Sequence, residues 1–142
     1  KNPLKRALRA DKLTLTILSK VLRLYEDPET LDQKLPLLKT LTIPVTELEN
    51  RAETLKSAFS ENFSVETRMS TVQIGSGALP DKTVESLALV VKHSQMKPED
   101  LLSKMRSLST PIIGRIKEDR IWLDMRGAEP LDELTRVIGE LG

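Results

Sequence analysis

The 142-residue chain has no cysteine and a single histidine, His93. The lack of cysteine excludes a disulfide framework, thiolate chemistry and cysteine metal sites, and it fits a reducing compartment. One histidine cannot build a histidine-based metal site or a serine-histidine-aspartate triad, and we interpret His93 as a surface residue after a strand. We therefore expect a cytoplasmic protein without a metal site.

Long apolar runs and aromatic residues are also scarce. No stretch approaches the roughly 18 to 20 apolar residues that span a bilayer, and the first residues lack the apolar segment of a secretory signal, so we expect no membrane partner. Aromatic residues make up 3% of the chain, which leaves the core to leucine, isoleucine and valine. The net charge of +1 provides no overall field that would attract nucleic acid, so any such contact would be local.

Residues 1–60 are predicted to be a helical segment. From Asp11 to Glu26, apolar residues recur every three or four positions, which predicts a helix with one buried face and with Asp11 as its N-cap. Pro36 predicts a break between two short helical turns, because proline disrupts a helix interior. The spacing Thr46-x-x-Glu49 is typical of a capping box and predicts a third helix that ends near Ser60.

Residues 61–142 change to a mixed pattern that predicts an α+β domain. Apolar and polar residues alternate from Phe63 to Met69, which is the period of a half-buried strand. The remaining elements are predicted as a strand at Val84–Lys92, a helix at Lys97–Leu108, a hairpin of Ile112–Ile116 with Ile121–Met125, and a helix from Pro130. The order β-β-α-β-β-α indicates a small, mostly antiparallel sheet covered by helices. We expect this domain and the helical segment to form one compact unit.

Two arginines three residues apart, Arg6 and Arg9, precede the first strong helix. They flank the apolar Leu8, which would anchor the segment, and two anchored guanidinium groups can grip a phosphate in bidentate fashion. The alternative is a solvated basic approach to the helix, which is common for such clusters.

Arg115 lies in the apolar segment Pro111–Ile116, directly after Gly114, which would allow another group to come close. Arg115 therefore either faces a ligand carboxylate or pairs across strands with an acid such as Asp124. Trp122 is interpreted as a core or interface anchor.

A Gly-Ser-Gly sequence within Gln73–Pro80 would let backbone amides approach an anion or cofactor, but it lacks the lysine of a P-loop and the third glycine of a dinucleotide fingerprint. We interpret it as a turn between strands. The scattered acids Asp81, Asp119 and Asp124 give no reason to pair any two as acid and base. No nucleophile, base or metal cluster accompanies the arginines, and the chain begins on Lys-Asn-Pro without methionine. We therefore expect a piece of an enzyme, with no catalytic residue of its own.

As an ordered set, these motifs resemble the C-terminal part of the bacterial selenocysteine synthase family, the L-seryl-tRNA(Sec) selenium transferases. The residues that carry the resemblance are Asn2–Leu15, Leu22–Tyr25, Asp27–Glu29, Gln73–Pro80, Pro111–Ile116 and Arg120–Arg126.

The resemblance implies the small C-terminal domain of a fold-type I enzyme that uses pyridoxal 5'-phosphate. The full enzyme would convert seryl-tRNA(Sec) to selenocysteinyl-tRNA(Sec) with selenophosphate, and its cofactor lysine would lie upstream of Lys1. Arg6 and Arg9 would bind selenophosphate or the phosphate released from it, and Arg115 would contact the acyl group of the substrate or the cofactor region. The resemblance leaves the cofactor-binding residues of this chain unassigned.

The same resemblance implies which partners the chain has and what it cannot do alone. The missing large and N-terminal domains of the chain would be the nearest partners, the N-terminal domain would carry most tRNA contacts, and the full enzyme would form a homo-oligomer. The chain alone should then bind no cofactor and be inactive. Two alternatives stay open: the small domain of a related pyridoxal-phosphate lyase, or a stand-alone RNA-binding module that uses Lys1, Lys5, Arg6, Arg9 and Lys12.

Overall fold

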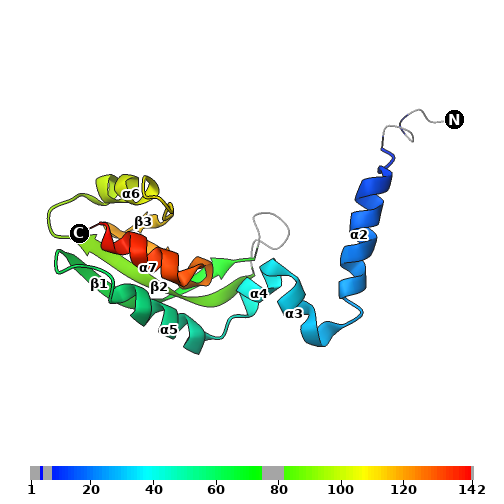
Figure 1. Ribbon diagram of the computed structural model, residues 1–142, viewed down its shortest axis with the longest axis horizontal. Helices are drawn as coiled ribbons and strands as arrows, with labels where there is room; N and C mark the ends of the chain where they lie inside the picture. Colours follow the sequence, from blue (N-terminus) through cyan, green and yellow to red (C-terminus); the bar gives the residue numbers. More distant parts are fainter. Residues whose placement is uncertain (1–3, 5–7, 75–81, 142) are drawn as a thin grey trace. The chain divides into compact units, whose positions relative to one another are not determined.

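The structure is a computed structural model that describes residues 4, 8–74 and 82–141 (Figure 1). It forms two compact units, Lys1–Thr42 and Ile43–Gly142. The helices of the first unit are α2 (Lys12–Leu24), η1 (Pro28–Thr30), α3 (Leu31–Lys34) and α4 (Pro36–Thr42). The predicted break at Pro36 is confirmed, because α3 ends at Lys34 and α4 begins at Pro36.

The start of α2 follows the predicted cap. One carboxylate oxygen of Asp11 accepts from the backbone N–H of Thr14 at 2.9 Å, and the other accepts from the Thr14 hydroxyl at 2.7 Å. These bonds satisfy a donor that the first helical turn leaves unpaired, and they lower the pKa of Asp11. Within the first compact unit no residue of α2 is buried, so the apolar face that the periodicity predicts has no partner there.

The second unit is built on an antiparallel sheet with strand order β1-β2-β4-β3. Its elements are α5 (Val45–Lys56), β1 (Phe63–Gln73), β2 (Thr83–His93), α6 (Pro98–Arg106), β3 (Arg115–Lys117), β4 (Arg120–Asp124), η2 (Met125–Gly127) and α7 (Leu131–Gly139). The predicted α+β class and the order β-β-α-β-β-α are confirmed. A hairpin is present at the predicted place, with Glu118 and Asp119 in the left-handed region at φ 56° as a two-residue turn requires. Its first strand differs from the predicted Ile112–Ile116, because β3 covers only Arg115–Lys117.

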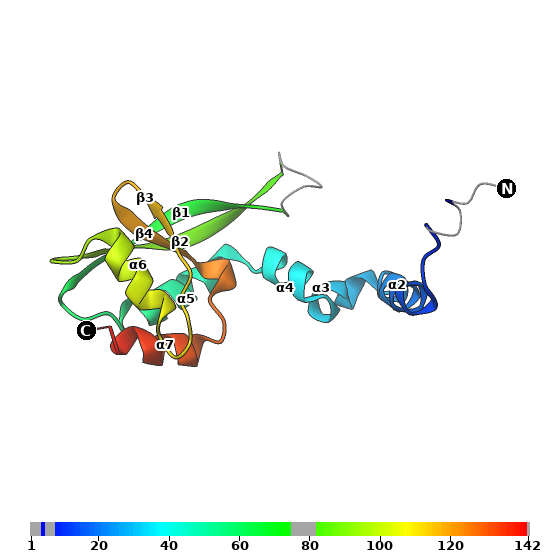
Figure 2. The same ribbon diagram turned by 90° about the horizontal axis from the view of Figure 1, so that it is seen from above.

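Helices α5, α6 and α7 lie on one face of this sheet (Figure 2). Alternate residues of the strands point toward them and, with the apolar stripes of the helices, form the main core. A separate small cluster of Ala88, Val90 and Trp122 lies on the opposite sheet face, which no described helix covers. That open face therefore carries side chains that are available for contacts outside the core.

Helix α5 belongs to the unit that contains the sheet. Leu48 and Leu55 are buried in its core, and Arg51 forms an ion pair with Glu129 at 2.7 Å. The compact unit consequently begins at Ile43, ahead of the boundary at residue 61 that the change of pattern predicts. The change of pattern marks where strands begin, whereas the packing of α5 decides where the unit begins.

The capping box predicted at Thr46 is wrong. Helix α5 begins at Val45 with Pro44 as N-cap and without a side-chain cap bond. The carbonyl of Pro44 already accepts from the backbone N–H groups of Glu47 and Leu48, so Thr46 lies inside the first turn. Proline holds its φ near the helical value, and this early start leaves Thr46 no capping role.

Candidate functional site

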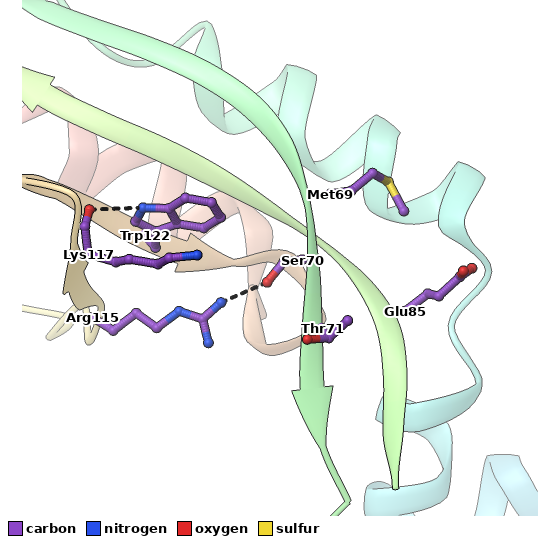
Figure 3. Close-up of a pocket in the computed structure, with 7 residues that line it drawn as sticks. All are labelled: Met69, Ser70, Thr71, Glu85, Arg115, Lys117 and Trp122. Atoms are coloured by element: carbon purple, nitrogen blue, oxygen red, sulfur yellow. Dashed lines mark hydrogen bonds between the residues drawn. The ribbon is translucent and has the colours of Figure 1, made fainter. Parts of the chain in front are cut away.

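The open sheet face carries a shallow pocket of about 310 Å³ at one end (Figure 3). Its centre is the guanidinium group of Arg115, which reaches from β3 to the edge strand β1 and donates through Nη2 to the Ser70 hydroxyl at 2.8 Å. The Arg115 guanidinium also lies 5.8 Å from the centre of the Trp122 ring. A hydrogen bond and a cation–π contact therefore hold the Arg115 side chain across the sheet.

Strand register explains this arrangement. Arg115 lies directly opposite Trp122 in the β3–β4 pair, so the two side chains share the open face. Ser70 continues the alternation of Ser64, Glu66 and Arg68 along β1 and points to the same face. Because side chains alternate with a period of two, the register brings a cation, an indole and a hydroxyl together from three strands.

A second cation lies beside Arg115. The ammonium of Lys117 is 4.8 Å from the centre of the Trp122 ring, and the indole Nε1 donates to the Lys117 backbone carbonyl at 3.2 Å. Trp122 is only 7% exposed, so the predicted anchor role is confirmed and the indole also supports both cations. Lys117 is also paired with Glu118 at 3.5 Å, and Glu85 lines the same pocket, so among the described residues the unpaired positive charge at this end is that of Arg115.

At the hairpin end of the same face, the arginine side chains are paired with a carboxylate. Glu66 accepts from Arg120 and from Arg68, each at 2.8 Å, and these arginines, Arg120 first, lower the pKa of Glu66. In contrast, no described carboxylate lies within ion-pair distance of Arg115. The charge that remains available on the face is therefore at Arg115.

The predicted cross-strand pair of Arg115 with Asp124 is wrong. Asp124 lies two residues beyond the position opposite Arg115, and its Oδ1 accepts from the Ser86 hydroxyl at 2.7 Å and from the backbone N–H of Arg126 at 3.0 Å. Asp124 thus caps the turn that follows β4, and Arg115 has no acidic partner in the part of the chain that the structure describes.

Close packing against β4 leaves no room for a side chain at Gly114. A Cβ at this position would lie 2.8 Å from both Ile121 and Leu123 and 3.1 Å from the Trp122 carbonyl. We expect Gly114→Ala to destabilise the chain by about 1 to 3 kcal/mol, because the added methyl group overpacks the contact between the segment and β4. Urea unfolding followed by Trp122 fluorescence checks this, and Gly139→Ala, where a Cβ meets nothing within 4 Å, is the control. Equal stability of the two variants would contradict the close approach.

The other predicted site residues lie apart from this pocket or outside the described residues. Arg9 is exposed, and its side chain is bonded to no other described residue. Arg6 and the Gly-Ser-Gly segment are outside the described residues. His93 ends β2, and its Nδ1 accepts from the backbone N–H groups of Gln95 and Met96 at 3.0 Å each, so it stabilises a turn.

Sequence reasoning missed Ser70 and Lys117. Extending the alternation of β1 past Met69 would have put Ser70 on the open face, but no local pattern identifies it as the partner of Arg115. Among the described residues, no group of histidine, aspartate and glutamate side chains is arranged to hold a metal ion. The helices in the described ranges are all too short or too polar to cross a membrane.

Several known proteins are similar in sequence to this chain. A protein called L-seryl-tRNA(Sec) selenium transferase from Pasteurella multocida is 41% identical over 145 residues, covering 99% of this chain and 32% of that protein. Proteins of the same name from Haemophilus influenzae (39% identical, 99% of this chain, 32% of that protein) and Klebsiella pneumoniae (44% identical, 90% of this chain, 29% of that protein) are also similar. The chain thus spans about a third of the length of the curated relatives that it matches.

The model of one protein family, described as L-seryl-tRNA selenium transferase, matches residues 1–129. This match includes all of the first compact unit and the second unit as far as residue 129, that is, the sheet and the segment with Arg115 but not α7. The chain therefore belongs to the L-seryl-tRNA selenium transferase family.

Proposed function

We propose that this chain is the C-terminal portion of an enzyme that converts seryl-tRNA(Sec) to selenocysteinyl-tRNA(Sec) with selenophosphate. The observation that carries the proposal is the similarity to relatives of that name along almost the whole chain. Because the chain spans about a third of those relatives, the proposal assigns the reacting centre jointly to this chain and to the rest of a longer polypeptide.

Arg6 and Arg9 bind the anionic selenium donor in this proposal. Guanidinium groups present paired N–H donors that match the oxygens of a phosphate, and two such groups can hold one anion from two sides. The exposed side chain of Arg9 supports the proposal, because its donors are not engaged by another described group. Holding the donor beside the acceptor lowers the entropic cost of bringing the two together.

Arg115 orients the acyl group of the substrate or contacts the cofactor region. Its guanidinium has five N–H donors, of which one is used by Ser70 among the described residues, and the rest line an open pocket. The stacking on Trp122 reduces the freedom of the long side chain before a ligand arrives. The pocket therefore suits an anionic or carbonyl oxygen that approaches the open sheet face.

Pyridoxal 5'-phosphate is the proposed cofactor of the full enzyme, where it supplies the electron sink for chemistry at the seryl carbon. The described residues do not fit its site: Lys117, which lines the pocket, has a side chain 56% exposed and lies over an indole in an open depression. We therefore assign the cofactor lysine to a segment upstream of Lys1 and expect the chain alone to be inactive. Cytoplasmic location and homo-oligomerisation of the full enzyme complete the proposal.

The alternative of a stand-alone RNA-binding module has less support. That module would use Lys1, Lys5, Arg6, Arg9 and Lys12, but aromatic residues for base stacking make up only 3% of the chain and the net charge is only +1.

A grafting experiment tests the proposal. Residues 1–142 replace the matching third of the Pasteurella multocida relative, and selenocysteinyl-tRNA formation is measured for the graft and for the 142-residue chain alone. We expect the graft to be active and the chain alone to show neither activity nor a visible absorbance band with pyridoxal phosphate. An inactive but folded graft, or activity of the chain alone, would contradict the proposal.

A further inference from the structure

Two depressions of the open sheet face meet at the Arg115 side chain. The first is the pocket described above, in which hydroxyl groups and a carboxylate line one side. The second has a volume of about 270 Å³, shares Arg115 and Trp122 with the first, and has an apolar wall. Both are lined entirely by residues of the second compact unit. The residues that line only one of the two include Ser70, Thr71 and Glu85 in the first and Val72, Ile113 and Asp124 in the second.

Most N–H groups of Arg115 are available to a ligand. The guanidinium carries five N–H donors, and among the described residues only Ser70 accepts from it, at 2.8 Å (Figure 3). This bond and the contact with the Trp122 ring hold the group in place before a ligand arrives. Paired N–H donors of this kind match a ligand group that offers two oxygens, as a carboxylate or a phosphate does.

The charges around Arg115 favour a ligand group with a single negative charge. Lys117 is paired with Glu118 at 3.5 Å, so among the described residues the unpaired positive charge is that of Arg115. Glu85 lines the first depression and Asp124 the second. A free phosphate, which carries nearly two negative charges, would be repelled by both carboxylates while one guanidinium attracts it. A phosphodiester carries one negative charge and meets less repulsion.

The proposed substrate contains groups of this kind. In seryl-tRNA the carboxyl group of serine forms the ester bond to the RNA, so its carbonyl presents one uncharged oxygen. Each phosphodiester of the RNA presents two unesterified oxygens and one negative charge. A nucleotide chain also places a ribose on either side of each phosphate, which corresponds to the two depressions on either side of Arg115. The shallow, open shape suits a segment of a large ligand, because sites for small molecules usually enclose most of the ligand.

We propose that Arg115 binds one phosphodiester group of the RNA part of the substrate through its two free oxygens. This inference rests on the proposed function, in which the substrate is seryl-tRNA, and it names the group that Arg115 contacts. Arg115 then orients the acyl group by holding the RNA to which that group is attached. Because the contact is single and the net charge of the chain is +1, it positions RNA that the rest of the full-length polypeptide binds.

The salt dependence of tRNA binding tests this contact. The graft of residues 1–142 onto the Pasteurella multocida relative is titrated with seryl-tRNA(Sec) and with tRNA(Sec) that lacks serine, at several salt concentrations. We expect Arg115→Gln to weaken both complexes about tenfold and to lower the slope of log K against log salt by roughly 0.7 to 0.9, because one phosphate contact is lost. Arg106→Gln, at the exposed end of α6 on the other side of the sheet, should change neither quantity.

Two further changes identify the group that is bound. Arg115→Lys keeps the positive charge without the paired donors, so we expect it to keep the salt slope and to lose about threefold in affinity. A tRNA(Sec) with a neutral methylphosphonate at the contacted phosphate should bind the wild-type graft about tenfold more weakly and should bind Arg115→Gln no more weakly than unmodified tRNA does. Single methylphosphonates along the 3′ strand of the acceptor stem locate that position.

The outcomes separate the possible ligands of Arg115. A loss confined to seryl-tRNA would indicate the acyl group, and a changed absorbance band of bound pyridoxal phosphate would indicate the cofactor region. Either result would overturn the proposal, and so would equal salt slopes for Arg115→Gln and Arg106→Gln. Circular dichroism of each variant checks the fold. Because binding is measured without turnover, an inactive graft contradicts the proposed function without changing the result of this test.

Discussion

Replacing Arg126 by alanine is expected to destabilise the chain by about 3 kcal/mol, as measured by urea unfolding with Trp122 fluorescence. Arg126 is only 6% exposed, and its guanidinium donates to the backbone carbonyl of Glu85 and, at 3.0 Å, to that of Ile43. Hydrogen bonds from a charged donor contribute about 1.5 to 3 kcal/mol each, and truncation would leave buried carbonyls without partners. The large effect follows from this loss of several bonds at once.

Arg106→Ala is the matched control for this prediction. Arg106 lies at the exposed end of α6, and a surface substitution of this kind changes the free energy of unfolding by about 0.5 kcal/mol or less. Arg126→Lys should fall between the two, because lysine keeps the charge but cannot reach two carbonyls with a planar fork. Equal unfolding free energies for Arg126→Ala and Arg106→Ala would show that the buried bonds do not stabilise the fold.

Replacing Arg9 by alanine in the grafted full-length enzyme is expected to lower kcat/KM for selenophosphate about 100-fold, which corresponds to about 2.7 kcal/mol. Two charge-assisted hydrogen bonds to a phosphate account for a loss of this size. Arg9→Lys should recover part of the loss, because it restores the charge without the bidentate geometry. Steady-state kinetics with varied selenophosphate at saturating seryl-tRNA measures the effect.

Arg23→Ala provides the control, because Arg23 is an exposed basic residue in the last turn of the adjoining helix α2. We expect it to change kcat/KM less than threefold and to leave the KM for seryl-tRNA unchanged. A double variant of Arg6 and Arg9 should lose less than the product of the single effects if both hold the same anion. Similar losses for Arg9→Ala and Arg23→Ala would remove Arg9 from the proposed site.

Local patterns predicted the elements of the second unit well. Alternation along β1 and the two apolar runs around Lys117–Arg120 identify strands because a strand repeats every two residues regardless of its partners. The Asp11 cap was also predictable, since capping depends on residues within one turn. Predictions that depended on distant groups were less successful, as the start of α5 at Val45 and the true partners of Asp124 demonstrate.

In the candidate site, too, local patterns were predictable and contacts between distant residues were not. The sequence predicted Arg115 as a residue of interest and left two environments open, of which the pair with Asp124 is contradicted by the register. Its actual partner, Ser70, lies 45 residues earlier in the chain and on the far edge of the sheet. No spacing rule connects two such positions, because their proximity depends on the order of four strands.

The amino-acid sequence by itself determined the α+β class, the order of strands and helices, the apolar character of α2 and the family resemblance, since these depend on local periodicity and on motifs. Only the tertiary structure decided that α5 packs with the sheet and that Trp122 supports Arg115 and Lys117. The physical reason is that burial and side-chain pairing depend on which surfaces meet, and those surfaces come from residues far apart in sequence.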